Sequence, residues 1–290
     1  MKFAGIIAEY DPFHNGHAWQ LAQAKALGAE RVAVAMSCSL VQRGALPLLP
    51  EAVRTRSALT CGADLVFALP APCACAGAEA FARAGVALLA AAGCDGLVFG
   101  AETPDAALLM EAAELLDSDS YRAALKAQLA GGARSFAAAR QTAAAKLASD
   151  ERVAALLDKP NNNLAVEYCR AIRSLAPRME AYPLPRQGAN HGEALHSAHG
   201  QFASASALRK LWAEGGADAV APYVPEAVFP LYQEAYAAGQ YTDFSAAGRC
   251  ELALLRSACR GKAPFADIRG VSEGLEHRLE AAVRTSTTYD

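Results

Sequence analysis

The opening of the chain constrains the fold most, because a buried strand there turns directly into a helix. Residues 2–8 form an apolar run of strand length, which Asp11-Pro12 interrupts. From Asn15 onward apolar residues recur at helical spacing until Gly28 ends the pattern. Short apolar runs and helical stretches continue to alternate along the chain, which predicts βα units around a parallel sheet.

The same patterns predict the rest of the architecture. Further strands are expected at residues 31–36, 64–69, 96–100 and 179–184, and helices at residues 50–61, 77–92 and 204–214. Residues 104–158 predict a helical insertion with one break near Gly131-Gly132, and the polar stretch from Asn190 to Ser204 predicts a loop. We therefore expect an α/β fold with a Rossmann-like parallel sheet, divided into a nucleotide-binding domain at 1–214 and a helical carboxyl-terminal part at 215–290.

Composition excludes several classes of protein. With 290 residues and 53% hydrophobic content, the chain can bury a large core. It has no uninterrupted apolar run of about eighteen residues and no signal-peptide pattern at its start, so we expect a cytoplasmic protein without membrane contact. A formal charge of −3 argues against a protein that coats nucleic acid without sequence specificity. The eight cysteines lack repeated Cys-x-x-Cys pairs and are expected to be free thiols rather than metal ligands.

Two histidines mark the start of the first predicted helix. His14 and His17 are three residues apart and share a face of the first turn, beside free backbone N–H groups that favour a bound anion. Gly16, between them, places no Cβ in the path of a phosphate. A bare pair of this kind is also compatible with a surface pair or half of a metal site. Its position after an apolar strand favours the His-x-Gly-His signature of adenylyltransferases, which stabilises the transition state at the α-phosphorus of ATP.

Several further segments, in the same order, make the chain resemble the bacterial tRNA(Met) cytidine acetate ligases, a branch of the HxGH nucleotidyltransferases. The resemblance covers nearly the whole chain. It rests on Gly5 to His17, Val41-Gln42-Arg43-Gly44, Gly62 to Val66, Leu69-Pro70, Phe99-Gly100, Glu102, Lys159 to Asn162, Arg186, Ser204 to Arg209 and Val271 to Glu276.

This resemblance implies a two-step ligase. Acetate attacks ATP to give acetyl-adenylate and pyrophosphate, with Mg²⁺ sharing the phosphate charge, and the N4 amine of the wobble cytidine of elongator tRNA(Met) then takes the acetyl group. The catalytic residues implied are His14, His17 and Arg209. The ATP-binding residues implied are Ile6, Ile7, Ala8, Glu9, Tyr10, Asp11, Pro12, Phe13, His14, Asn15, Gly16, His17, Ala18, Trp19, Gly100, Asn162, Arg186, Gln187, Ser204 and Ser206.

Simpler structural roles stay open for some of these residues. Gly100 is also typical of a strand end, Asn162 of a helix cap and Ser204 and Ser206 of the cap of the following helix, while Arg209 is also compatible with a surface ion pair. A second histidine group, which we expect to face solvent or substrate rather than a metal, consists of His191, His196 and His199. Two other functions remain open: a small-molecule adenylyltransferase of the same superfamily, and a nucleotide-binding module without catalysis.

The sequence departs from the family pattern at three places. Asp11 stands where asparagine is usual and adds negative charge near the phosphates, Cys38-Ser39 replaces a Gly-Asn pair, and Asn190 replaces an aromatic residue. Arg43 lies in the loop that borders the active site in the family, where it could hold acetate or an RNA phosphate. The family generally continues past the position of Asp290 with a basic helical segment, from which we expect phosphate contacts to RNA.

Overall fold

A five-stranded parallel sheet organises the chain. The computed structural model describes residues 1–42, 44–132, 135–185, 195–197, 200–260, 265–268, 271 and 274–287, with the backbone alone at 195–197, 200 and 201. The strands lie in the order β3-β2-β1-β4-β5, so the expected parallel sheet is confirmed. Their bounds are β1 Phe3–Ala8, β2 Arg31–Ser37, β3 Leu65–Leu69, β4 Gly96–Ala101 and β5 Glu180–Pro185.

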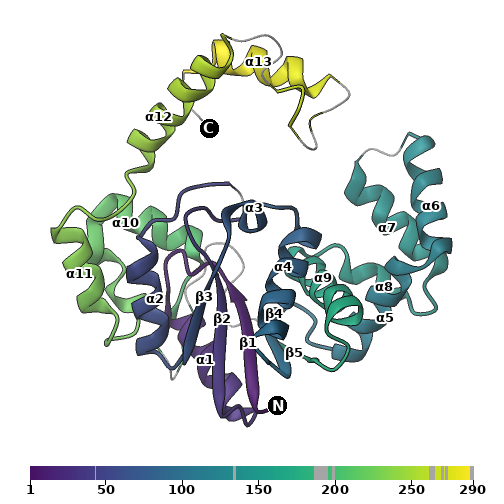
Figure 1. Cartoon of the computed structure of the whole chain (residues 1–290), viewed down its shortest axis with the longest axis horizontal. Helices are drawn as coiled ribbons and strands as arrows, with labels where there is room; N and C mark the ends of the chain where they lie inside the picture. The colour runs from purple at the N-terminus through teal and green to yellow at the C-terminus, as the bar shows by residue number, and fades with distance from the viewer. Residues whose placement is uncertain are drawn as a thin grey trace. The chain divides into compact units, whose positions relative to one another are not determined.

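Helices cover both faces of this sheet (Figure 1). One face packs against α1 Asn15–Ala26, α2 Glu51–Thr60, α10 Ala205–Ala219 and α11 Phe229–Ala237, and the other against α4 Ala78–Ala91 and α9 Pro160–Leu175. Successive side chains of a strand serve opposite faces, because strand side chains alternate: Val32 and Val34 join the first core, while Ala33 and Ala35 join the second. The result is a three-layer α/β/α sandwich. The short helices α3 Ala71–Ala74 and η1 Ala221–Tyr223 complete its connections.

The helical insertion is confirmed between β4 and α9, but the expectation of a single break is wrong. It contains α5 Ala106–Asp117, α6 Asp119–Ala130, α7 Phe136–Leu147 and α8 Glu151–Leu156. Ser118 and Asp150 each cap a new helix with their side-chain oxygen, accepting from the N–H groups of Tyr121 and Arg152. Caps of this kind interrupt an alanine-rich helical pattern without glycine or proline.

An ion-pair network ties the insertion to the sheet domain. The buried Glu167 of α9 accepts from Arg140 of α7 at 2.6 Å and from Arg170 at 2.7 Å. Arg170 reaches Asp117 at the end of α5 at 2.8 Å. Since each charge here is paired and largely removed from water, removing one partner would leave an uncompensated buried charge.

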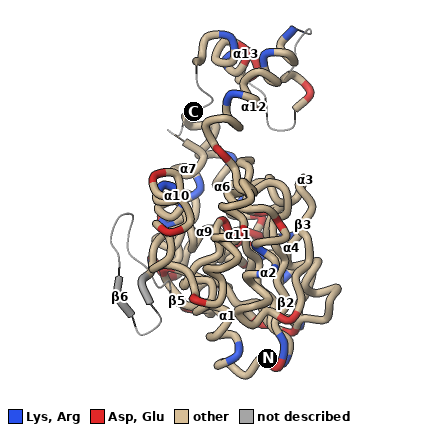
Figure 2. The backbone as a smooth tube through the Cα atoms, turned by 90° about the vertical axis from the view of Figure 1, so that its left-hand side faces the viewer, with Lys and Arg blue, Asp and Glu red and all other residues tan. Residues whose placement is uncertain are grey.

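The chain divides into two compact units, Met1–Gln240 and Tyr241–Asp290. The first unit includes α10 and α11, beyond residue 214, because Trp212 and Tyr232 lie in the core that α1 and α2 form on the sheet. The second unit contains α12 Phe244–Ala258 and α13 Leu275–Thr285, which pack through a small cluster around Leu252 and Val283. Basic and acidic residues are interspersed along the described backbone (Figure 2).

One further expectation from the sequence is wrong. The stretch from Asn190 to Ser204 was expected to form a loop, whereas β6 Leu195–Ser197 and β7 Gly200–Phe202 within it pair as an antiparallel ribbon. Alternation over so few residues is too short for a hydrophobic pattern to reveal a strand. Among the described helices, none combines the length and the apolar character needed to cross a membrane.

Candidate active site

A cavity of about 270 Å³ lies where the strand order reverses. From β1 the chain continues through β2 to β3 on one side, and then returns to place β4 on the other side of β1. The connections that follow the neighbouring strands β1 and β4 therefore lead to opposite sides of the sheet. Open α/β sheets bind ligands in the crevice at such a switch point. Ile7 of β1 and Phe99 and Gly100 of β4 form its floor. The volume is just below the range of about 300–1,000 Å³ usual for ligand pockets.

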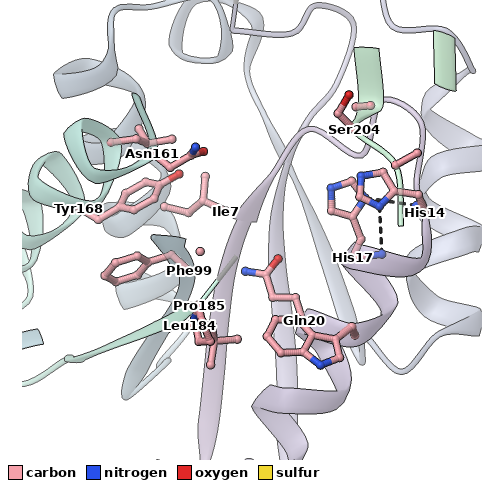
Figure 3. Close-up of a pocket in the computed structure, with 16 residues that line it drawn as sticks. Ile7, His14, His17, Gln20, Phe99, Asn161, Tyr168, Leu184, Pro185 and Ser204 are labelled. Carbon is pink, nitrogen blue, oxygen red and sulfur yellow. Dashed lines mark hydrogen bonds between the residues drawn. The ribbon is translucent and has the colours of Figure 1, made fainter. Parts of the chain in front are cut away.

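His14 and His17 form one wall of this cavity (Figure 3). His14 is the N-cap of α1, and its Nδ1 accepts the Gly16 N–H at 3.0 Å, while Nδ1 of His17 accepts the His14 N–H at 3.3 Å. The two rings stack with centroids 3.8 Å apart. Because Nδ1 of each neutral ring is an acceptor, the ring proton resides on Nε2. Both imidazoles therefore present a donor from Nε2, beside the positive end of the helix dipole.

Packing fixes the geometry of this histidine pair. A Cβ on Gly16 would lie 2.9 Å from Cε1 and 3.0 Å from Nδ1 of His14, so the glycine is needed by the histidine ring itself as well as by an approaching ligand. Tyr10 supports His17 from the other side, with ring centroids 4.8 Å apart in an edge arrangement. Tyr10 has a positive φ of 50°, which is uncommon for a residue with a side chain. Strained backbone of this kind concentrates at functional sites.

The opposite wall comes from the amino-terminal half of α9. Asn161, Leu164 and Tyr168 line the cavity at positions i, i+3 and i+7, which place them on one helix face. The start of α9 is held by Glu102, whose carboxylate accepts the N–H groups of Asn161 at 3.2 Å and Asn162 at 2.7 Å. Burial alone would raise the pKa of Glu102, but these bonds and a third from the Asn161 side chain together lower it. The carboxylate thus replaces the missing N-cap side chain of this helix.

The start of α10 forms the rim above the histidines. Ser204 lines the cavity and caps the helix, accepting the Ala207 N–H at 3.2 Å, so the expected serine cap is confirmed. Arg209, one turn further on, pairs with the loop after β1: its Nη1 donates to the main-chain oxygen of Asp11 at 2.7 Å and to Oδ2 of the same residue at 3.1 Å. Oδ1 of Asp11 accepts the Leu48 N–H at 2.6 Å.

A buried arginine holds the loops that follow β1 and β2. Arg54 of α2 is fully buried, and within the described part of the chain its guanidinium donates only to main-chain oxygens. These belong to Glu9 and Ser37 at 2.7 Å, to Leu49 at 3.0 Å and to Cys38. One side chain therefore ties the ends of β1 and β2 to the loop that follows β2.

The structure brings together only part of the expected ATP-binding set. Among the residues with described side chains, the members that line the cavity are Ile7, His14, Gly16, His17, Trp19, Gly100 and Ser204. Ile6, Tyr10 and Phe13 are buried in the core behind it. Asn162 is also buried, and its side-chain amide binds Thr103. Oδ1 of Asn162 accepts the Thr103 N–H at 2.9 Å, and Nδ2 of Asn162 donates to the Thr103 hydroxyl at 3.1 Å. Asn161, rather than Asn162, faces the cavity.

Several residues that line the cavity have no role predicted from the sequence. Gln20 donates to the Val98 carbonyl at 3.1 Å and lies three residues after His17, so helical spacing alone could have identified it. Phe99 and Tyr168, with ring centroids 5.4 Å apart, come from distant segments, and no local signal could have joined them. The expected site residues Arg43, Arg186, Gln187, Asn190, His191 and His199 lie outside the described residues, as does the side chain of His196.

Comparison with known proteins connects this geometry to a family. A family model described as "HIGH Nucleotidyl Transferase" matches residues 1–290. The chain belongs to the HIGH nucleotidyl transferase family. Two curated relatives within it are both named tRNA(Met) cytidine acetate ligase. The protein of Syntrophotalea carbinolica is 37% identical over all of this chain and 68% of its own length, and that of Acetivibrio thermocellus is 33% identical over all of this chain and 71% of its own. The resemblance to this branch is therefore confirmed.

Solved structures of a similar protein agree with the fold. The apo form of Thermotoga maritima TmcAL superposes with a TM-score of 0.88 at 30% identity, over the whole of this chain and 69% of that one. The form bound with alpha-thio ATP gives a TM-score of 0.86 at 29% identity, with the same coverage. A relative with this fold thus binds an ATP analogue.

Proposed function

We propose that the protein is an ATP-dependent ligase that activates acetate as acetyl-adenylate and transfers the acetyl group to the N4 amine of the wobble cytidine of elongator tRNA(Met). The observation that carries this proposal is the stacked pair His14 and His17, whose Nε2 donors stand at a helix N-terminus beside the switch-point cavity. The names of the curated relatives support the choice of substrates and favour this ligase over a small-molecule adenylyltransferase.

In the first step, a carboxylate oxygen of acetate attacks the α-phosphorus of ATP. The bond to the bridging oxygen of the β-phosphate breaks, and pyrophosphate leaves with the electron pair. The Nε2–H groups of His14 and His17 stabilise the negative charge that develops on the phosphate oxygens, because preorganised donors need no rearrangement when the charge appears. Adenosine lies over Gly100 and against the α9 wall, where the exposed glycine lets a ring approach the backbone.

In the second step, the N4 amine of cytidine attacks the acetyl carbonyl carbon. AMP leaves with its phosphate oxygen, and the amine loses one proton, which gives N4-acetylcytidine. The same histidine donors face the phosphate of the leaving AMP. The proposal includes a cytoplasmic location, because ATP and tRNA both occur there.

Mg²⁺ enters this scheme as the companion of ATP. Magnesium is usually held by one or two carboxylates together with substrate phosphates. In the part of the chain that the structure describes, no group of three or more His, Cys, Asp or Glu side chains could hold a metal ion. The carboxylates near the cavity, Glu9, Asp11 and Glu102, accept main-chain N–H groups. When bound, Mg²⁺ would neutralise phosphate charge, with the phosphates of ATP as its main ligands.

Acetate-dependent pyrophosphate release tests the first step, and mass spectrometry of nucleosides from tRNA incubated with ATP and acetate tests the second. His17→Ala should slow adenylate formation by about 10²–10³-fold, the usual cost of losing one such donor. His277→Ala provides the matched control, because that histidine is 81% exposed in the second unit. Release that depends on a phosphorylated metabolite instead of acetate would contradict the proposal, and so would normal adenylate formation by His17→Ala.

A further inference from the structure

The floor of the cavity lies where β1 and β4 separate. The two strands, both fully described, pair at two positions, and the later of these joins Gly5 to Leu97. Beyond that pair, β1 stays paired with β2 and β4 with β5 to the end of each strand. Ile7 and Phe99 follow the last shared pair by two residues on their strands and line the cavity. The separation of the strands therefore leaves a corner with apolar side chains at its base.

A buried hydroxyl group faces this corner. Tyr168 of α9 is 4% exposed and lines the cavity (Figure 3). The centroid of its ring lies 5.4 Å from that of Phe99. Among the described residues, no group makes a hydrogen bond with its Oη. Because a buried hydroxyl without a hydrogen bond is costly, we expect a ligand to supply the partner.

The Tyr168 hydroxyl keeps its proton near neutral pH. Burial, and after it the negative charge of Glu9, raise the pKa of this group. A neutral hydroxyl can donate a hydrogen bond without giving up its proton. A carboxylate bound beside it therefore stays ionised, which is the form that can attack phosphorus.

We propose that the corner formed by Ile7, Phe99 and Tyr168 is the acetate subsite, in which the Tyr168 hydroxyl donates to one carboxylate oxygen and Ile7 and Phe99 contact the methyl group. This inference rests on the proposed function. The second carboxylate oxygen is then available to attack the α-phosphorus of ATP, which the proposed function places at His14 and His17 on the facing wall. Acetate is a small anion with one apolar end, so its chemistry matches a corner with one donor and apolar sides.

The α9 wall is long enough to hold adenosine and acetate at different places. Asn161 and Tyr168 are seven residues apart on one face of the helix, which corresponds to about 10 Å along its axis. Adenosine occupies the end of the wall at Asn161 and Gly100, and acetate occupies the end at Tyr168. The two substrates of the first step thus share the cavity without competing for one position.

Tyr168→Phe tests the hydroxyl, because it removes one oxygen atom and keeps the ring. In acetate-dependent ATP–pyrophosphate exchange, kcat/KM for acetate should fall by about 10- to 100-fold, the effect of losing a hydrogen bond to a charged group. KM for ATP should change by less than about twofold. Saturating acetate should restore most of kcat, whereas a loss caused by altered packing would not be reversed by acetate.

Tyr121→Phe is the matched control. Tyr121 is also 4% exposed, but its hydroxyl donates to the Arg140 carbonyl at 3.4 Å and it does not line the cavity. Its substitution should leave both kinetic constants unchanged. An unchanged kcat/KM for acetate in Tyr168→Phe would overturn the proposal. A KM for ATP that rises as much as that for acetate would also overturn it, because the hydroxyl would then serve the nucleotide.

The chain length of the acid tests the apolar side of the subsite in the wild type, so this test holds even if Tyr168→Phe does not fold. One extra methylene group in an apolar pocket changes kcat/KM by about 10- to 200-fold. We therefore expect propionate to be used at least about tenfold less well than acetate. Equal use of the two acids would overturn the proposal. Exchange by the wild type that needs no carboxylic acid would instead overturn the proposed function, and would be seen before any variant is compared.

Discussion

Gly16→Ala should separate activity from stability, because its added methyl group meets the ring of His14, which we propose to be catalytic, rather than the core. The new Cβ would lie 2.9 Å from Cε1 and 3.0 Å from Nδ1 of His14. Carbon atoms at rest stand about 3.5–4.0 Å apart, so the ring must move by about 0.5–1 Å. That movement breaks the 3.0 Å bond from the Gly16 N–H and re-aims Nε2. A shift of this size should lower kcat by about 10- to 100-fold, or about 1.4–2.7 kcal/mol.

Stability should change little in the same variant. Alanine gains about 0.5–1 kcal/mol over glycine within a helix, and loss of the His14 cap costs about 0.5–2 kcal/mol. The two terms nearly cancel, so Tm should move by only a few degrees. Gly77→Ala is the control, since a Cβ there meets nothing within 4 Å and Gly77 does not line the cavity. Steady-state pyrophosphate exchange and thermal unfolding provide the two measurements. A folded Gly16→Ala protein with wild-type kcat would refute the reasoning.

Two further predictions concern groups with shifted pKa values. Hydrogen bonds from α9 hold the pKa of Glu102 below its usual value. The ionised carboxylate therefore stabilises the folded protein fully above the unfolded pKa of about 4.3, and this stabilisation is lost as the pH falls through the lower folded pKa. The difference in Tm between wild type and Glu102→Gln should therefore shrink from pH 7 to pH 3, and a constant difference would contradict this cap. Burial raises the pKa of Cys94 and Cys169 to about 12, so a thiol reagent at pH 8 should modify the exposed Cys250 first and these two only after unfolding. Peptide mapping checks the order, and early labelling of Cys169 would be the contrary result.

The sheet could be predicted because its signals are local. Strands buried on both faces read as continuous apolar runs, as in Arg31–Ser37, and each is followed by a helical pattern. The histidine pair was equally local, since cap, glycine and both rings fall within four consecutive residues. The serine cap of α10 belongs to the same class.

Long-range pairing accounts for what the sequence could not show. Asp11 and Arg209 are 198 residues apart, so no local pattern in the sequence could identify either one as the partner of the other. The surface carboxylate that was one expected partner of Arg209 is instead a buried one, Asp11. The breaks at Ser118 and Asp150 are a different case, because their capping residues were visible but the alanine-rich composition outweighed them.

Arg54 has a consequence for how freely the active-site loop can change its sequence. Among the described residues, every oxygen that accepts a hydrogen bond from the Arg54 guanidinium belongs to the main chain, so these bonds do not depend on the side chains of the residues that they hold. Cys38 and Ser39 can therefore stand where the family usually has glycine and asparagine without loss of the contact at residue 38. The residues of this loop can therefore be replaced while its backbone path is kept, because the side chain that holds the path, Arg54, belongs to the separate helix α2.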